Sequence, residues 1–63
     1  MMKLKELLAL LEIGWFTVID RDTELRTEPL CDAGGSQLKT LRDKKVKSIR
    51  LSGWFIEIEV AAK

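Results

Sequence analysis

Three acidic side chains stand at alternate positions in one short stretch: Asp20, Asp22 and Glu24. This spacing opens a calcium-binding loop of the EF-hand type, whose ligands begin at positions one, three and five. Such a loop also needs Gly at position six and Glu at position twelve. Here position six is Leu25 and position twelve is Cys31. We therefore interpret the stretch as a solvated turn and expect no metal site.

Nucleophilic chemistry and phosphate binding have one weak candidate each. Cys31 is the only cysteine, and the chain has no His to activate its thiol or to complete a zinc site. We expect Cys31 to be a buried or semi-buried structural thiol. Gly34-Gly35-Ser36 resembles a phosphate-binding helix start, but the GxxxxGK[ST] pattern is absent, which favours a loop and helix cap. The sequence predicts no catalytic residue, no cofactor and no enzyme.

The strongest charge feature is a basic run. The net charge of +1 divides unevenly, because residues 1–35 carry four basic and seven acidic groups, and residues 36–63 carry seven basic and three acidic. Nucleic-acid sites combine basic patches with aromatic side chains. The pI of about 7.9 and the nearby Glu57 and Glu59 weigh against such a site. Nucleic-acid binding is therefore the alternative hypothesis, through these residues: Lys39, Arg42, Lys44, Lys45, Lys47 and Arg50.

All aromatic residues lie in two stretches that begin alike, GWFTVID at positions 14–20 and GWFIEIEV at positions 53–60. Neighbouring side chains of a strand point to opposite faces, so each Trp-Phe pair must divide between the two faces of a sheet. We expect Phe16 to point inward and Trp15 to lie on the outer face with Ile19. In the second stretch we expect Trp54 inward and Phe55 outward.

An amphipathic helix is predicted before the first stretch. Gly14 is placed to end this helix in a left-handed cap. Leu10 falls off the apolar face, so we expect it to be exposed and open to a partner. The apolar face itself recurs at i, i+3, i+4 and i+7: Leu4, Leu7, Leu8 and Leu11.

The remainder of the chain predicts strands and one short helix. Pro29 ends the second strand, which is more polar than the first, and suggests an edge position. Ser36 can cap a short helix that carries Leu38 and Leu41. Segments rich in β-branched and aromatic residues predict the strands: Trp15–Asp20, Glu24–Glu28, Val46–Leu51 and Trp54–Val60.

Ser52-Gly53 is predicted as the two-residue turn between the last two strands. This turn gives a largely apolar face with the pairs Leu51–Trp54, Ile49–Ile56 and Lys47–Ile58. The opposite face is mixed and carries Arg50–Phe55, Ser48–Glu57 and Val46–Glu59. The predicted fold is α+β: helix, β-hairpin, short helix and β-hairpin, forming a four-stranded, mainly antiparallel sheet with one face covered by the N-terminal helix.

The length of 63 residues predicts a single small domain, residues 1–63. A chain this short buries only about 60% of its unfolded surface, and one cysteine excludes an internal disulfide. Oligomerisation is the stabilising device that remains, and a tightly packed, well-idealised monomer is the alternative; we expect a homodimer. No apolar run is long enough to span a membrane. Glu6 and Glu12 bracket the apolar run Leu7–Leu11, so we expect no signal peptide and a cytoplasmic location.

The order of "LKELLALL", "VIDRDTEL", "LRDKKVKSI" and "WFIEIEV" resembles short uncharacterised proteins from phages and mobile elements of Gram-positive bacteria. Those proteins open with an LxxLL helix and end with a VxSI strand and a hydrophobic hairpin. The resemblance implies a small α+β domain of phage or mobile-element origin. It further implies stoichiometric binding to a host protein, including inhibition of a defence system, in the host cytoplasm. The Leu30–Gly35 loop and the Trp-Phe pairs depart from the pattern.

The leading hypothesis is a non-enzymatic protein-binding module that acts through the open sheet face. Exposed apolar patches mark interfaces, and Trp and Arg are favoured at their centres. The expected partners are a second copy of the chain and an unidentified host protein, without a membrane. The predicted interface residues are Trp15, Ile19, Phe55, Arg50 and Leu10.

Overall fold

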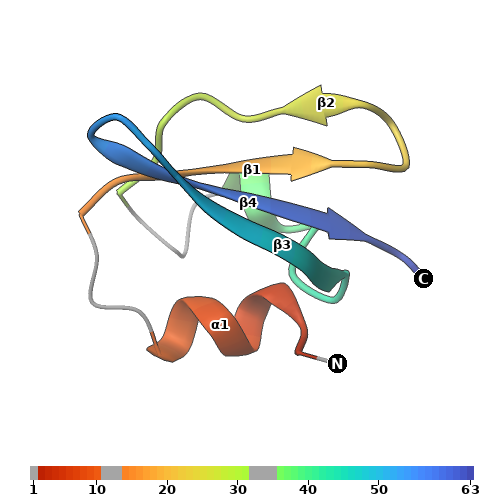
Figure 1. The fold of residues 1–63 in the computed structure, drawn as a ribbon. Coiled ribbons are helices and arrows are strands. Elements are labelled where there is room, and N and C mark those ends of the chain that lie inside the picture. Colours follow the sequence, from red (N-terminus) through yellow and green to blue (C-terminus); the bar gives the residue numbers. More distant parts are fainter. Residues whose placement is uncertain (1, 11–13, 32–35) are drawn as a thin grey trace.

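The computed structural model describes residues 2–10, 14–31 and 36–63. Within them, one helix, a 3-10 turn and four strands follow in sequence (Figure 1). The elements are α1 (Leu4–Leu10), β1 (Phe16–Asp20), β2 (Leu25–Arg26), the 3-10 helix η1 (Ser36–Leu38), β3 (Lys45–Ser52) and β4 (Phe55–Ala61).

The strands form one mixed sheet in the order β2-β1-β4-β3. The two outer pairs, β1 with β2 and β3 with β4, are antiparallel. The central pair is parallel, with Phe16 in register with Ile56 and Asp20 in register with Val60. The α+β class and the four-stranded sheet are therefore as predicted, and the parallel centre is a feature that the sequence analysis did not anticipate.

A single apolar cluster joins the helix to the sheet. Leu4, Leu7 and Leu8 of α1 are buried, as the leucine stripe predicts. Figure 1 shows α1 on one side of the sheet. Burial of each such side chain contributes about 1.5–3 kcal/mol to stability. The cluster is completed from β1, β4, η1 and the segment after η1, by Phe16, Val18, Ile58, Val60, Leu38 and Leu41.

The start of α1 is fixed by backbone and side-chain hydrogen bonds. The Lys3 N–H donates to the Glu6 carboxylate at 3.0 Å, which is one half of a capping box. The Leu4 N–H donates to the Lys44 carbonyl at 2.9 Å, and the Val46 N–H donates to the Met2 carbonyl at 2.9 Å. The residues before α1 thereby cover the first part of the outer edge of β3.

The glycine that takes a left-handed conformation is not the predicted one. Gly53 is the only glycine with a positive φ among the described residues, so the prediction of a left-handed cap at Gly14 is wrong. Leu11 lies outside the described residues, as does the Gly34-Gly35 pair. The short helix predicted after Ser36 is a single 3-10 turn.

The β1–β2 connection is a tight turn that ends on a left-handed residue. Glu24 has φ 60° and its N–H donates to the Asp20 carbonyl at 2.7 Å. Strand β2 is much shorter than the predicted Glu24–Glu28 strand. Beyond β2, the Thr27 N–H still donates to the Val18 carbonyl at 2.9 Å. Pro29 lacks an N–H for a continuous ladder, and Leu30 then exchanges backbone hydrogen bonds with Phe16 at 2.7 and 2.9 Å.

The β3–β4 turn lies one residue later than predicted. Ser52 pairs with Phe55, so Gly53 and Trp54 form the two-residue turn. Gly53 has φ 63°, and Gly at the first central position is what a type II′ turn requires. The later turn keeps Ile49 and Leu51 on the core-facing side, but it moves Trp54 out of the strand.

The shifted turn also changes every predicted cross-strand pair. Arg50 lies opposite Glu57 instead of Phe55, and Ser48 lies opposite Glu59. Lys47 is predicted opposite Ile58, but it lies at an irregularity between Val46 and Ser48 instead. This β-bulge shifts the register by one residue, so that Val46 instead of Lys47 lies opposite Val60.

We expect Gly53→Ala to lower the free energy of unfolding by about 1–2 kcal/mol, because an L side chain is strained at φ 63°. Gly14→Ala is the matched control, since an added Cβ has no atom within 4 Å at either position and only Gly53 has positive φ. Urea denaturation of both variants measures the difference. Equal stabilities for the two variants would contradict this account of the turn.

Candidate functional site

The acidic turn after β1 holds an ion-pair cluster. The Lys44 ammonium donates to the carboxylates of Asp20 at 2.7 Å and Asp22 at 2.9 Å. Asp20 is buried and also accepts from the Thr23 hydroxyl at 3.2 Å. The Ala62 N–H donates to Asp22 at 2.8 Å. A cation from the same chain therefore lies between the two carboxylates that resemble the start of a calcium loop.

The same contacts shift the protonation equilibria. The hydrogen bond from Lys44 lowers the pKa of Asp20 below its ordinary value of 3.8, against the opposing effect of burial. The pKa of Asp22 is lowered by the Lys44 ammonium and then by the Ala62 N–H. The pKa of Lys44 is raised by its hydrogen bonds to the two carboxylates. All three groups are therefore charged at neutral pH.

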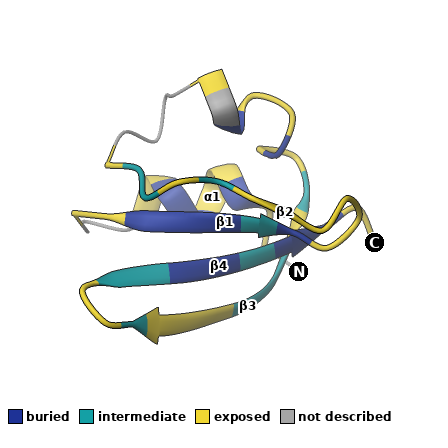
Figure 2. Ribbon diagram, turned by 90° about the horizontal axis from the view of Figure 1, so that it is seen from above, coloured by how far each residue is buried: buried dark blue, intermediate teal, exposed yellow. Residues whose placement is uncertain are grey.

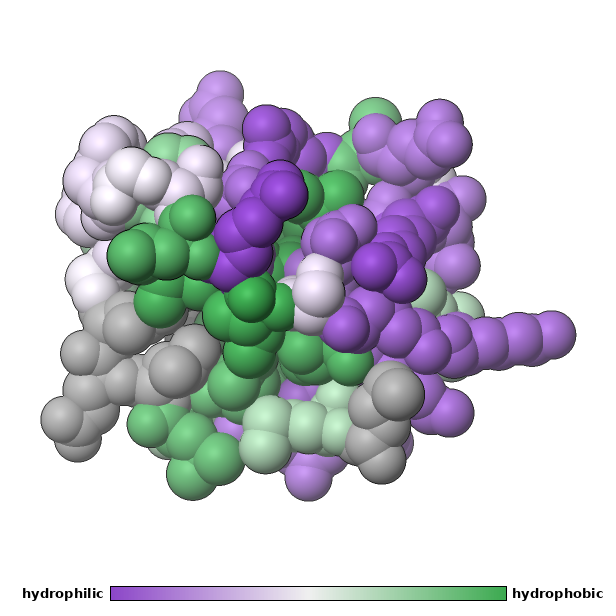
Figure 3. Space-filling view, viewed as in Figure 1, coloured by the Kyte–Doolittle hydropathy of each residue, from purple (hydrophilic) through white to green (hydrophobic). Residues whose placement is uncertain are grey.

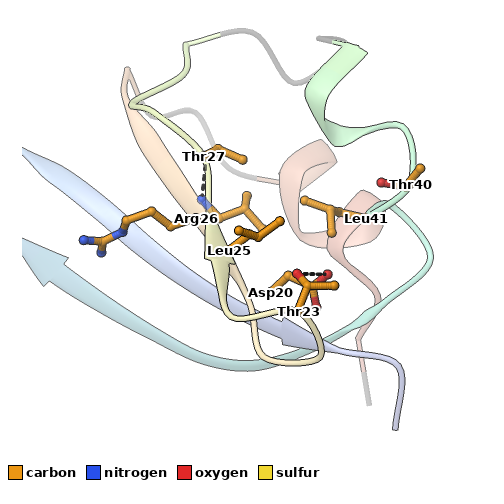
Figure 4. A pocket seen from close by; sticks show the side chains of 8 residues that line it. Asp20, Thr23, Leu25, Arg26, Thr27, Thr40 and Leu41 are labelled. Atoms are coloured by element: carbon orange, nitrogen blue, oxygen red, sulfur yellow. Dashed lines mark hydrogen bonds between the residues drawn. The ribbon is translucent and has the colours of Figure 1, made fainter.

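A groove of about 390 Å³ opens beside this cluster (Figure 4). The Thr27 hydroxyl accepts from the Val18 N–H at 3.0 Å, and the Asp20 carboxylate is held as described above. In Figure 4 the Arg26 side chain extends away from the groove, and it pairs with Glu57. The polar groups named here are thus engaged within the fold. The lining residues are Val18, Asp20, Thr23, Leu25, Arg26, Thr27, Thr40 and Leu41.

On the sheet face opposite the apolar cluster, Glu57 is the centre of one charged row. It is in register with Thr17 on β1 and with Arg50 on β3. Its buried carboxylate accepts from Arg50 at 3.0 Å and forms an ion pair with Arg26 of β2. The Thr17 hydroxyl is the one buried side-chain polar atom without a partner in the described part of the chain. Arginines from both outer strands thus share one central carboxylate.

Glu59 forms the second charged row on this face. Its carboxylate accepts from Arg21 at 3.1 Å and from the Ser48 hydroxyl at 2.6 Å. These two contacts, the Arg21 contact first, lower the pKa of Glu59 below its ordinary value of 4.5. Ile19 is in register with Glu59 and is half-buried in the same row. The middle of the open face is therefore polar and internally paired.

The exposed aromatic residues gather at one end of the sheet. The ring of Trp54 lies 5.8 Å from that of Trp15 at 72°, and 5.1 Å from that of Phe55 at 73°. These are edge-to-face contacts. The Ile56 N–H donates to the Trp15 carbonyl at 3.2 Å, which ties the chain before β1 to β4. We call Trp15, Trp54 and Phe55 the aromatic cluster.

An apolar patch on the outer edge of the sheet continues from this cluster. Ile49 is 50% exposed, Leu51 77% and Trp54 66%; we call these three residues the β3 edge patch. Figure 2 shows exposed colouring along β3 beside the more buried β1 and β4. In Figure 3 hydrophobic residues gather on the face that β3 and α1 share. A hollow of about 270 Å³ joins the cluster to the patch, lined by Gly14, Trp15, Leu51, Gly53, Trp54, Phe55 and Ile56.

The predicted interface residues do not form one surface. Trp15 and Leu10 are exposed, as predicted, but Leu10 lies at the end of α1. Phe55 is half-buried in the aromatic cluster, whereas Ile19 and Arg50 lie within the charged rows.

The division of the aromatic residues is only partly as predicted. The inward position of Phe16 is confirmed, because it is 3% exposed. The prediction that Trp54 points inward is wrong, because Gly53 and Trp54 form the turn. The predicted interface residues do not include the exposed Ile49, Leu51 and Trp54. A Gly at the first turn position was the available signal.

The basic residues of the alternative hypothesis do not form a free cationic surface. Lys44 is held by Asp20 and Asp22, and Arg50 is held by Glu57. Arg42 and Lys47 also have interaction partners. Lys39 and Lys45 are exposed.

Cys31 is exposed, so its prediction as a buried or semi-buried thiol is wrong; it follows the Leu30 bridge at the point where the chain leaves the sheet. No group of three His, Cys, Asp or Glu side chains is placed to hold a metal ion within the described ranges. None of the helices described has the length and apolar character needed to cross a membrane.

Comparison with known proteins gives no relative. No family model, no curated protein and no solved structure matches the chain.

The ion-pair cluster predicts that the free energy of unfolding decreases in acid. Asp20 and Asp22 have lowered pKa values in the folded state, so the unfolded chain binds more protons near the ordinary carboxylate pKa. The resulting stabilisation is present above pH 3.8 and is lost as the pH falls through the lowered folded values. We expect Lys44→Met to lower the urea midpoint at pH 7 and to weaken its dependence on pH below about pH 5.

Lys39→Met is the control, because Lys39 is exposed and its replacement removes the same charge. Urea denaturation from pH 3 to pH 7 compares the two variants with the unmodified protein. A pH profile for Lys44→Met that parallels the unmodified profile would refute the assigned role of Lys44.

Proposed function

We propose that this protein is a non-enzymatic protein-binding module. Its contact surface is the aromatic cluster together with the β3 edge patch. The observation that carries the proposal is the exposure of Trp15, Leu51 and Trp54 around one hollow at the end of a small sheet, with the exposed Ile49 next along β3. Contiguous exposed apolar surface marks interaction sites, and Trp is favoured among residues that dominate binding energy.

The polar groups of the fold support binding rather than chemistry. Asp20, Asp22, Glu57 and Glu59 are all hydrogen-bonded to basic side chains. A general acid or base needs a titrating group directed at a substrate, and these carboxylates are directed at their own chain. The same ion pairs neutralise the positive charges of Lys44 and Arg50. This neutralisation favours a protein partner over nucleic acid.

The proposal also includes the arrangement of the helix over two hairpins and the origin of the protein. In this proposal α1 covers one face of a sheet built from two hairpins, and the sheet end and one edge remain available to partners. The sequence resemblance suggests that the protein belongs to a phage or mobile element of Gram-positive bacteria. In this proposal it acts in the host cytoplasm by stoichiometric contact with a host protein, including one of a defence system, and it does so as a homodimer.

We expect Trp15→Ala to lower the yield of specifically captured protein at least tenfold in a tagged pull-down from Gram-positive host lysate. Loss of a central Trp costs about 2 kcal/mol or more in such interfaces. Leu25→Ala is the matched control, since Leu25 is 68% exposed on the opposite edge of the sheet. Mass spectrometry identifies proteins captured by the unmodified chain and the control.

Two results would count against the proposal. The first is an identical set of captured proteins with Trp15→Ala. The second is salt-sensitive binding of labelled DNA or RNA that Lys45→Glu removes and Trp15→Ala leaves intact, because this result would assign the function to the basic residues.

A further inference from the structure

The outer edge of β3 has unpaired backbone groups next to apolar side chains. Ser52 and Phe55 close the two-residue turn, and the closing residues of such a turn hydrogen-bond to each other. Backbone groups alternate along an antiparallel strand. Those of Arg50 therefore face β4, whereas those of Ile49 and Leu51 face away from the sheet. No hydrogen bond within the described part of the chain occupies these outward groups.

The two edges of the sheet differ in their protection. Strand β2 has only two residues, Leu25 and Arg26, and Pro29 follows shortly after. A short edge followed by Pro resists pairing with another chain. On β3, residues before α1 cover Lys45 and Val46 through an isolated bridge and a hydrogen bond to Met2. The part of β3 that carries Ile49 and Leu51 has no such cover.

We propose that a second copy of this chain pairs antiparallel with β3, with the two-fold axis between the two Ile49 residues. This inference rests on the proposed function, because it names the partner of the β3 edge patch. The pairing joins two four-stranded sheets into one continuous sheet. Each Ile49 faces its counterpart and lies diagonal to Leu51 of the second copy, on the side of the sheet that carries the apolar cluster.

Reduced like-charge repulsion favours this register on the opposite side of the sheet. Arg50 then lies opposite Ser48 of the second copy. Ser48 is in register with Glu59, so Arg50 and the second copy's Glu59 fall in one row, two strand spacings or about 10 Å apart. A shift by two residues would instead place Arg50 directly opposite itself, and like charges in that position are destabilising.

The proposed dimer also places one copy of the Trp15 contact surface at each of its two ends. Antiparallel pairing directs the two Gly53-Trp54 turns in opposite directions, about 30 Å apart at 3.3 Å for each residue. Each dimer then presents two copies of Trp15, one at each end. Two linked contact sites raise the apparent affinity for a multivalent partner without any new contact.

The oligomeric state tests the inference first. Light scattering at tens of micromolar is expected to give the mass of a dimer, and Ile49→Lys is expected to weaken self-association at least tenfold. Leu25→Lys places the same charge on the opposite edge and is expected to leave the dimer intact. Leu51→Lys is the second variant if Ile49→Lys does not fold, because Leu51 is more exposed.

Cysteine crosslinking tests the register in a Cys31→Ser background. Two Ile49→Cys residues at the axis lie about 5.5 Å apart between Cα atoms, which is within disulfide range. Two Arg50→Cys residues lie about 7–8 Å apart on the diagonal, beyond that range. We expect a disulfide-linked dimer for Ile49→Cys and not for Arg50→Cys or Leu25→Cys. A strict monomer, a dimer unaffected by either lysine variant, or preferential crosslinking through Arg50→Cys or Leu25→Cys would overturn the inference.

The two proposals fail separately in these experiments. A monomeric protein whose protein capture still depends on Trp15 would overturn only the β3 pairing. A dimer that is abolished by Ile49→Lys, but whose captured proteins do not depend on Trp15, would overturn only the proposed contact with a foreign protein.

Discussion

The parallel pairing of β1 with β4 is the constraint on which the remaining structure depends. It aligns Phe16 with Ile56 and Val18 with Ile58, so one face of the two central strands supplies the part of the apolar cluster that comes from the sheet. Because parallel strands begin at the same end of a sheet, it also brings the two GWF triplets together. The contact between Trp15 and Trp54 is a direct consequence. An all-antiparallel sheet would have separated these strand starts.

The same register organises the charges. Glu57 and Glu59 lie on β4. Glu57 pairs with Arg26 of β2 and Arg50 of β3, and Glu59 pairs with Arg21 of the turn after β1. A buried carboxylate is costly unless it is paired and hydrogen-bonded, and Glu57 has two guanidinium partners. The ion pairs on the open face therefore favour this order of the strands, and this face offers little apolar surface to a partner. Apolar contact area is left at the sheet end and at the β3 edge, where the exposed Ile49 and Leu51 flank the paired Arg50.

Local patterns were sufficient for part of this fold. The leucine spacing identified α1, and alternation placed Phe16 inward and Trp15 outward. Alternation could not place Trp54, because its outcome depends on which two residues make the turn, and a shift by one residue moved Trp54 out of the strand. Strand order and the partnership of Lys44 with Asp20 join positions far apart in the chain. No periodicity in a single sequence encodes such contacts, so the candidate surface was only partly predictable: Trp15 and Phe55 were identified, and Ile49 and Leu51 were not.

A chain of 63 residues buries only a low fraction of its unfolded surface, as small domains do. Two exposed apolar residues on a central or protected strand would be unremarkable. On an edge with outward N–H and C=O groups they form a template for another strand. The chain protects β2 and the first part of β3 but leaves the segment around Ile49 uncovered. This difference in protection along the sheet edges is the structural basis of the proposed pairing at β3.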